Sequence, residues 1–150
     1  MKLEKTSSCV YKIRYHLVAV VKYRKAILTE EIEKYIRYVL GGITERYLIV
    51  IDEVGFDQDH IHLFCGARPT VSPMEILGTI KSITARKVFE QFPLLKEKEL
   101  WGGEFWSDGK YIGTIGDETN EATVRKYIQD QGVEKEIEES RLKQLRLFKI

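Results

Sequence analysis

Asp59-His60-Ile61-His62-Leu63-Phe64 is the stretch around which the rest of the chain is organised. Its apolar residues and its alternating pattern are typical of a β-strand. Because strand side chains alternate between faces, His60 and His62 share one face while Ile61 and Leu63 share the other. Two imidazoles on one rigid face are a candidate pair of metal ligands, since a neutral imidazole offers a lone pair to a cation. On its own, however, a His-x-His pattern favours two histidines on a solvated strand face, so the metal interpretation requires a third group.

A third group is available near the other end of the chain, within residues 121–132. This segment reads as a helix, because Asn120 can act as its N-cap and Gly132 is a C-terminal stop signal. Tyr127 and Gln131 stand at positions i and i+4, so they are neighbours on one helix face. A phenol and an amide oxygen are therefore presented together.

The periodicity of the remaining residues predicts a mixed α+β fold. Strand-like runs alternate with two apolar segments that begin at the N-cap residues Thr29 and Ser72. The first of these helices is expected to bury Ile32, Ile36, Val39, Leu40 and Ile43, and Gly41-Gly42 to weaken its last turns. The predicted elements are a strand at 10–21, a helix from Thr29, strands at 47–51 and 59–64 around a turn at 54–58, a helix from Ser72, and a strand after the aromatic stretch 94–110. This order is that of a ferredoxin-like or RRM-like antiparallel sheet with helices packed on one face, which leaves the other face free.

The His-x-His strand followed much later by a single helical tyrosine, with glutamine one turn on, resembles the HUH single-tyrosine transposases. These TnpA-like enzymes move small bacterial and archaeal insertion sequences as single-stranded DNA. The resemblance extends over about residues 11–132, with the expected pieces in the expected order, and residues 111–116 resemble the strand before the tyrosine helix. One departure is the segment 19–21, where relatives often carry Trp and Pro.

Five residues are candidates for DNA contacts. Lys22, Tyr23 and Arg24 follow the first strand, where cations around an aromatic ring suit a surface that tracks a nucleic-acid backbone. Without the resemblance, this segment would be interpreted as an ordinary charged strand end. Lys81 and Arg86 lie on the second predicted helix and resemble the family's basic central helix.

The resemblance implies a catalytic mechanism for these residues. Tyr127 would be the nucleophile that forms a 5′-phosphotyrosine with DNA, and His60, His62 and Gln131 would hold a divalent cation. Imidazole ligands alone would suggest zinc or manganese, whereas the resemblance implies Mg²⁺ or Mn²⁺. It also implies single-stranded DNA with subterminal hairpins as the partner. A homodimer is expected as well, in which the connector at residues 113–119 lets the Tyr127 helix complete the partner's site.

The composition places limits on the class of protein. The chain has 150 residues and a net charge of +1, so we expect a single domain at 1–150, with a core at about 10–132 and a helical tail at 133–150. Any nucleic-acid site is then a local patch rather than a general basic field. Cys9 and Cys65 are expected to be reduced thiols, and no apolar run suits a membrane or signal segment. The expected location is the cytoplasm, in association with the nucleoid.

Three other interpretations remain open at this stage. The same fold could be a non-catalytic single-strand nucleic-acid-binding module that stacks bases on Tyr23 and Trp106. A metal-dependent hydrolase could use His60 and His62, although no further His or carboxylate stands at helical spacing. A domesticated relative that processes chromosomal repeat hairpins would share every site residue. His16, in the first strand, is interpreted as a packed or hydrogen-bonded histidine rather than a ligand.

Overall fold

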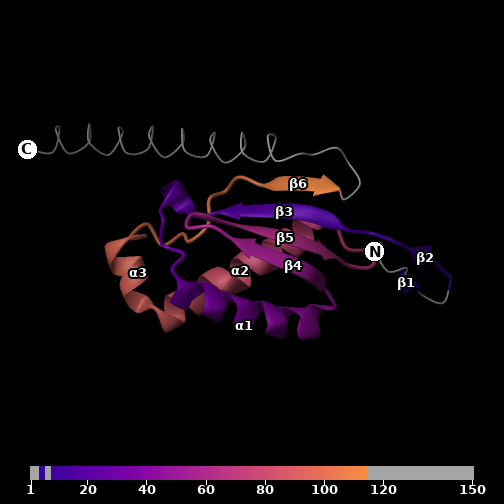
Figure 1. Cartoon of the computed structure of the whole chain (residues 1–150), viewed down its shortest axis with the longest axis horizontal. Coiled ribbons are helices and arrows are strands. Elements are labelled where there is room, and N and C mark those ends of the chain that lie inside the picture. Colours follow the sequence, from indigo (N-terminus) through magenta and orange to yellow (C-terminus); the bar gives the residue numbers. More distant parts are fainter. Residues whose placement is uncertain (1–3, 6–7, 115–150) are drawn as a thin grey trace, which may run out of the picture.

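The structure is a computed structural model that describes residues 4–5 and 8–114. Four strands form an antiparallel sheet in the order β4-β5-β3-β6 (Figure 1). The chain order β3-α1-β4-β5-α2-β6 confirms the predicted α+β, ferredoxin-like arrangement. The elements are β1 (Glu4–Lys5), β2 (Val10–Tyr11), β3 (Tyr15–Val20), the 3-10 turn η1 (Lys22–Arg24), α1 (Glu30–Tyr47), β4 (Val50–Phe56), β5 (His60–Gly66), α2 (Pro73–Gln91), α3 (Pro93–Lys98) and β6 (Tyr111–Thr114). The predicted tyrosine-bearing helix and the tail lie outside the described residues.

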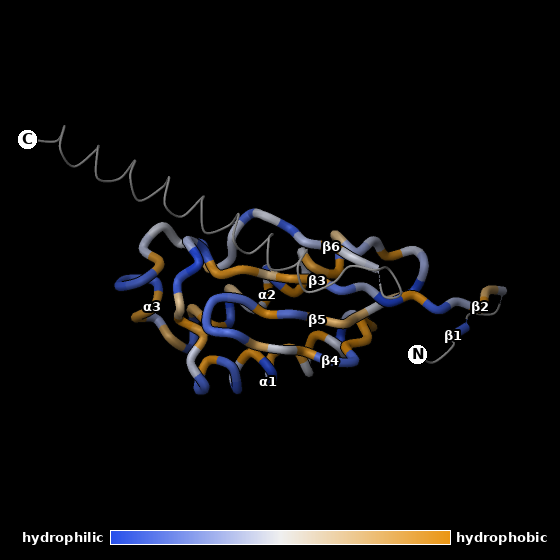
Figure 2. Tube along the Cα trace, turned by 45° about the horizontal axis from the view of Figure 1, so that its top comes forward, coloured by the Kyte–Doolittle hydropathy of each residue, from blue (hydrophilic) through white to orange (hydrophobic). Residues whose placement is uncertain are grey.

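One face of the sheet is covered by α1 and α2, as Figure 1 shows. The hydrophobic colour in Figure 2 runs along β3 and returns on the inner sides of these helices. On the helix-facing side, β3, the residue after it and β5 contribute completely buried side chains, which are Leu17, Ala19, Val21, Ile61, Leu63 and Cys65. The histidines must therefore occupy the opposite face, as strand alternation predicts. No helix among the described residues is long and apolar enough to cross a membrane.

Both central helices begin where the sequence predicts. The Thr29 hydroxyl accepts a hydrogen bond from the backbone N–H of Ile32, and Ser72 caps α2 in the same way. The five apolar residues predicted for α1 are its buried residues. Gly41 and Gly42 do not end the helix, which continues to Tyr47, because its apolar stripe keeps packing against the core beyond them.

The strand predicted at 10–21 is interrupted, which corrects the sequence interpretation. Val10–Tyr11 pairs with β1, and the main strand starts at Tyr15. Between them Arg14 is buried and forms ion pairs with Asp52 and Glu4. A Cβ added at Gly66 would lie 2.2 Å from the carbonyl oxygen of Ile13, so the backbone approaches there more closely than any other residue type allows.

Two boundaries around the histidine strand also differ from the prediction. Tyr47 belongs to α1, and β4 runs from Val50 to Phe56, so the strand predicted at 47–51 lies further along the chain. The turn predicted at 54–58 is confined to residues 57–59, where the Asp57 N–H donates to the His60 carbonyl at 2.9 Å. The reason is tertiary, since pairing with β5 extends β4 through its glycine at position 55.

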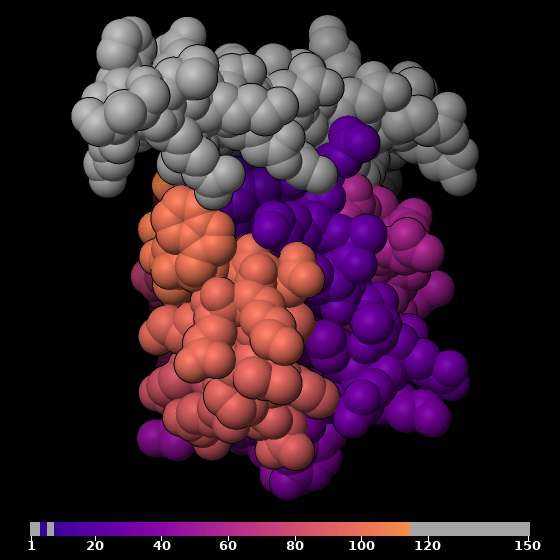
Figure 3. All heavy atoms as spheres, turned by 90° about the vertical axis from the view of Figure 1, so that its left-hand side faces the viewer, coloured from indigo at the N-terminus to yellow at the C-terminus, as the bar shows by residue number. Residues whose placement is uncertain are grey.

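The aromatic stretch 94–110 includes α3 and a loop that returns to β3. Trp106 is 5% exposed, and its indole N–H donates to the Thr84 hydroxyl at 2.9 Å, so it is a core residue and not the base-stacking surface that one interpretation required. Trp101, by contrast, is 58% exposed. Figure 3 shows this region packed beside the segment that follows β3. Backbone bonds from Lys22 to Phe105 and from Ser107 to Val20 join the two segments.

Candidate functional site

Three histidines meet on the sheet face opposite the helices. The antiparallel register of β3 and β5 pairs His16 with Phe64, Val18 with His62 and Val20 with His60. Because directly paired residues project from the same face, all six side chains lie together. His60 and His62, two residues apart on β5, have their Nε2 atoms 2.9 Å from each other. His16 reaches across from β3, with its Nε2 atom 3.0 Å from Nδ1 of His62.

His60 is held by an acidic neighbour. Its Nδ1 lies 2.7 Å from Oδ1 of Asp59, and Oδ2 of the same carboxylate lies 3.2 Å from Nε of Arg24. An ionised carboxylate only accepts hydrogen bonds, so His60 Nδ1 carries the proton and donates it to Asp59. In the neutral ring the Nε2 lone pair is then available. Arg24 reaches this carboxylate from a strained segment, since Tyr23 and Arg24 both have positive φ, 59° and 52°.

The two histidine contacts of His62 differ in geometry. The His16 and His62 rings are 22° from coplanar with centroids 5.3 Å apart, so their nitrogens face each other along the line between the rings. The His60 and His62 rings are inclined at 71° with centroids only 4.7 Å apart, and their two Nε2 atoms lie 2.9 Å from each other. These Nε2 atoms therefore meet at an angle rather than in line.

Burial favours the neutral form of the His62 and His16 rings. It lowers the pKa of His62 to about 4, with smaller contributions from the neighbouring His60 and His16. Burial also lowers the pKa of His16. At neutral pH, His62 and His16 are thus uncharged imidazoles, and the neutral ring is the form that binds a metal.

The donor set fits a divalent cation. Nδ1 of His60 contacts Asp59, and Nδ1 of His62 contacts His16. The two Nε2 atoms are therefore the nitrogens that could bind an ion. The two Nε2 atoms lie 2.9 Å apart, so one ion could take both as ligands. Among the described residues no group of three or more His, Cys, Asp or Glu side chains could hold a metal, so His60 and His62 are a pair of candidate ligands and not a complete site.

Two predicted site residues, Tyr127 and Gln131, lie outside the described residues. Tyr111 on β6, which is paired with Val18 in the sheet, lies near the histidines. Its ring stands edge-on to His16 with centroids 5.6 Å apart. Tyr111 packs with the buried side chains of Val18 and Val20 in a small apolar cluster on this face.

The structure separates the five candidate DNA-binding residues into different environments. Lys22 forms an ion pair with Glu104 at 3.1 Å and lies over the Tyr23 ring, 5.3 Å from its centroid. Arg24 is paired with Asp59, as described above. The Lys81 ammonium donates to the backbone carbonyls of Ser107 and Gly109 at 2.6 and 3.3 Å, and burial lowers its pKa. Arg86 is exposed on α2.

Sequence reasoning missed the partner groups of the histidines. His16 is hydrogen-bonded, as predicted, but its contact with His62 follows from the pairing of β3 with β5. Asp59 is adjacent to His60 in sequence, and strict strand alternation would have placed it on the opposite face. It lies before the first residue of β5, in the turn at 57–59, which frees its side chain to reach Nδ1 of His60. An acidic residue directly before the first histidine was the available signal.

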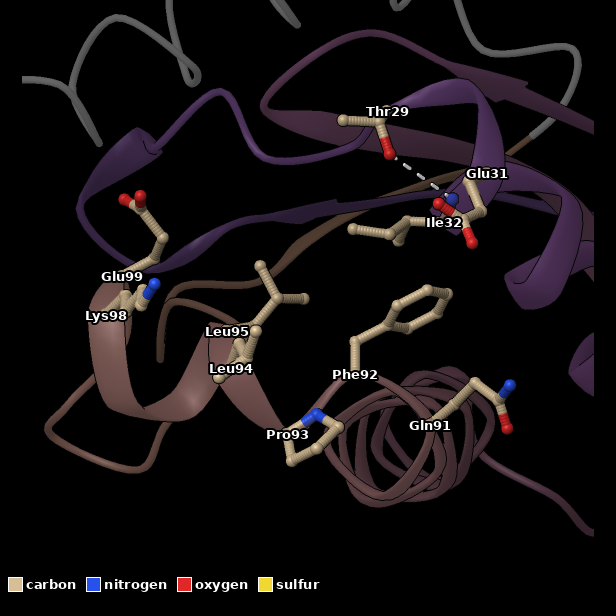
Figure 4. A pocket seen from close by; sticks show the side chains of 10 residues that line it. All are labelled: Thr29, Glu31, Ile32, Gln91, Phe92, Pro93, Leu94, Leu95, Lys98 and Glu99. Atoms are coloured by element: carbon tan, nitrogen blue, oxygen red, sulfur yellow. Dashed lines mark hydrogen bonds between the residues drawn. The ribbon is translucent and has the colours of Figure 1, made fainter.

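A pocket lies apart from the histidines, between the start of α1 and the junction of α2 with α3. Figure 4 shows Ile32, Phe92 and Leu95 pointing into it. The same view shows the Thr29 cap at its rim, bonded to the N–H of Ile32. None of the predicted site residues lines this pocket, so its apolar character belongs to the packing of the helices rather than to the site.

Comparison with known proteins agrees with this architecture. The family described as "Transposase IS200 like" matches residues 9–131. The ISDra2 transposase TnpA of Deinococcus radiodurans is 32% identical over 131 residues, which cover 87% of this chain and 92% of that protein. The transposase for insertion sequence element IS200 of Salmonella typhimurium is 31% identical over 121 residues, covering 81% of this chain and 78% of that protein.

A solved structure is also similar. It is the crystal structure of a putative transposase from Deinococcus radiodurans, with a TM-score of 0.78 and 30% identity, and the match covers 85% of this chain and 97% of that one. The family match at residues 9–131 includes the whole four-stranded sheet and both histidines of β5. The chain therefore belongs to the IS200-like transposase family and is a TnpA-like DNA transposase.

Proposed function

We propose that this transposase cleaves and rejoins single-stranded DNA at insertion-sequence ends through a 5′-phosphotyrosine intermediate, in a metal-dependent reaction. The observation that carries the proposal is that the His60 and His62 Nε2 atoms meet on the sheet face opposite α1 and α2, in a chain of this family. Two imidazoles that have their Nδ1 atoms in hydrogen bonds and their Nε2 atoms together support a cation site rather than a purely structural role.

His60, His62 and Gln131 would hold Mg²⁺ or Mn²⁺. When bound, the ion would withdraw charge from the scissile phosphate as a Lewis acid. Asp59 and His16 keep the ligand rings oriented, and Arg24 holds the Asp59 carboxylate in place. The ligand face is thereby prepared before DNA binds, which limits the reorganisation needed at the moment of reaction.

Tyr127 would supply the nucleophile. Its phenolic oxygen attacks the phosphorus, the bond to the DNA 3′ oxygen breaks, and the 3′ oxygen leaves with the electron pair and takes up a proton. An ordinary phenol has a pKa of about 10, so deprotonating it at pH 7 costs about 4 kcal/mol, which the site must offset. The phosphotyrosine keeps the energy of the broken phosphodiester, so rejoining needs no nucleoside triphosphate.

The DNA partner is proposed to be single-stranded, with subterminal hairpins. Arg86 is exposed on α2 and free to approach a phosphate backbone, whereas Lys22 and Arg24 would have to exchange their carboxylate partners for phosphates. Lys81 contributes differently, because its ammonium is committed to two backbone carbonyls. Of these residues, Arg86 is the one expected to contact DNA without breaking a contact.

The decisive experiment is capture of the covalent intermediate. Labelled single-stranded DNA carrying the element's end hairpin, incubated with the protein and Mn²⁺, should give an adduct that survives denaturing electrophoresis. Tyr127→Phe should abolish the adduct and keep hairpin binding. Tyr111→Phe is the matched control, because Tyr111 lies near the histidines, and it should leave adduct formation intact. An undiminished adduct with Tyr127→Phe would refute the assignment, and hairpin binding without any adduct in the wild type would favour a binding module.

Assembly is part of the proposal. In a two-fold homodimer, the Tyr127 helix of each chain would complete the site of its partner. Tyr127→Phe and His60→Ala, each inactive alone, then give a heterodimer in which one site carries both lesions and the other carries none. Mixing the variants under conditions of subunit exchange should restore activity. Continued inactivity in a proven heterodimer would show that each chain completes its own site.

A further inference from the structure

The hydrogen-bond partners of His62 do not determine which of its two ring nitrogens carries the proton. The partner of His60 does determine this. The partner of His60 Nδ1 is the Asp59 carboxylate, which can only accept a proton in a hydrogen bond. The partner of His62 Nδ1 is the Nε2 atom of His16, and an imidazole nitrogen can either donate or accept. The tautomer of His62 is therefore coupled to the tautomer of His16.

Two proton arrangements fit these contacts, one without an ion and one with an ion shared by the two Nε2 atoms. Without an ion, His62 Nε2–H donates to His60 Nε2, and His16 Nε2–H donates to His62 Nδ1. With an ion, both Nε2 atoms on β5 must present lone pairs, so the proton of His62 resides on Nδ1 and is donated to His16 Nε2. The proton of His16 then resides on its own Nδ1. Each ring holds one proton in both arrangements, so no proton is taken up or released overall.

We propose that His16 is a positioning residue of the metal site, which accepts the His62 Nδ1–H and so holds His62 in the tautomer whose Nε2 lone pair faces the ion. This inference rests on the proposed metal site at His60 and His62. His16 itself touches neither the ion nor DNA in this role. It acts through His62, in the way that a carboxylate partner acts on other metal-bound histidines.

The surroundings of His16 suit this role. Its ring stacks on Phe64, 14° from parallel with centroids 4.7 Å apart, and meets the edge of Tyr111 on its other strand neighbour. Across the β3–β6 pair it faces Gly113, which has no side chain to displace the ring. The ring is thus held with Nε2 directed at His62, nearly in the plane of that ring, which is the geometry of a well-aligned hydrogen bond.

Two substitutions of His16 distinguish a role in positioning His62 from a role in packing. His16→Phe keeps an aromatic ring against Phe64 but removes the acceptor, whereas His16→Gln places an amide oxygen near the position of Nε2. Binding of Mn²⁺ to the full chain is measured from the electron paramagnetic resonance signal of free Mn²⁺. We expect His16→Phe to weaken binding by about 10–100-fold, the usual cost of losing such a partner, and His16→Gln to restore most of it. Thermal unfolding of both variants checks that the fold is retained.

The possible outcomes are distinguishable. If the wild type and His60→Ala show the same lack of Mn²⁺ binding, the metal site itself is refuted, and this inference with it. If the wild type binds and His60→Ala does not, while folded His16→Phe binds like the wild type, the metal site stands and the positioning role is refuted. Equal weakening of Mn²⁺ binding by His16→Phe and His16→Gln would also refute the positioning role. The loss of affinity would then not depend on a hydrogen-bond acceptor at position 16.

Nitrogen-15 NMR of the imidazoles provides a second readout that does not depend on affinity. At pH 8, where ordinary imidazoles are neutral, the metal-free protein should show Nε2–H tautomers for His16 and His62. Diamagnetic Mg²⁺ should shift both to the Nδ1–H tautomer in the same titration, while the tautomer of His60 stays the same. A change at His62 without a change at His16 would overturn the coupling of the two rings.

Discussion

The two faces of β5 carry different kinds of side chain, because alternate residues of a strand point to opposite sides of the sheet. Ile61 and Leu63 are completely buried and contact side chains of the helix layer. Within the described residues, the hydrogen-bonding partners of the His60 and His62 rings come from β3, β5 and the turn before β5. The period of two along the strand thus separates the core-facing side chains from the proposed metal ligands. Substitutions on one face should change the free energy of unfolding, and substitutions on the other should change cleavage.

The largest expected effect is on cleavage. His62→Ala removes one Nε2 donor from the proposed metal site and should lower the rate of adduct formation by about 10²–10³-fold or more. The free energy of unfolding should change less than it does for Leu63→Ala, because no apolar surface of the main core is exposed. The rate is measured in chelator-treated buffer with Mn²⁺ restored. A wild-type rate under these conditions would mean that the histidine face has only a structural role.

Substitutions on the helix-facing side of β5 should change stability rather than cleavage. Leu63→Ala leaves a cavity between the sheet and the helices and should lower the free energy of unfolding by about 2–5 kcal/mol. Denaturant unfolding gives this value. Below the unfolding transition, adduct formation per folded molecule should stay close to that of the wild type. A large loss of activity in the folded state would show that the two faces are coupled through the strand.

A smaller effect distinguishes two basic residues on α2. Lys81→Met leaves the carbonyls of Ser107 and Gly109 without their donor and should lower the free energy of unfolding by about 1–3 kcal/mol. Arg86→Met is the matched control at an exposed position and should leave stability unchanged. Hairpin affinity, measured by fluorescence anisotropy at low salt, should fall for Arg86→Met. Unchanged affinity would remove Arg86 from the proposed DNA surface.

The smallest effect concerns the thiols. Cys65 continues the helix-facing row of Ile61 and Leu63, and burial raises its pKa to about 12. Iodoacetamide reacts with the thiolate, so at pH 8 native protein should be alkylated at the exposed Cys9 and spared at Cys65. Mass spectrometry after digestion identifies the modified residue. Rapid alkylation of Cys65 in native protein would show that this part of the core opens readily.

A raised thiol pKa also predicts a direction for stability against pH. Because the folded state keeps the Cys65 proton more tightly than the unfolded state, this group leaves stability unaffected at neutral pH and reduces it as pH rises from about 9 toward 12. Denaturant unfolding of the wild type and of Cys65→Ala at pH 7 and pH 10 tests the sign. The difference in unfolding free energy between the two proteins should shift in favour of Cys65→Ala at pH 10.

Local patterns in the sequence were sufficient for the element types and for the two histidines. Thr29 and Ser72 cap helices because their hydroxyls satisfy N–H groups within the same turn, which needs no distant partner. Strand alternation, which likewise needs no distant partner, placed His60 and His62 on one face. The boundaries were less predictable. Arg14 interrupts the first strand because of ion pairs with Asp52 and Glu4, which are remote in sequence from one another.

Only the tertiary structure brought the proposed metal ligands and their hydrogen-bonding partners together. His16 and His62 are 46 residues apart, and nothing in the local sequence of either specifies that β3 lies beside β5 in the register that joins them. The burial of Trp106 and the commitment of Lys81 to a loop likewise depend on how a distant segment folds back onto α2. The sequence by itself determined which side chains could do chemistry. Strand pairing, a long-range consequence of burying the helix-facing side of the sheet, decided which of them meet.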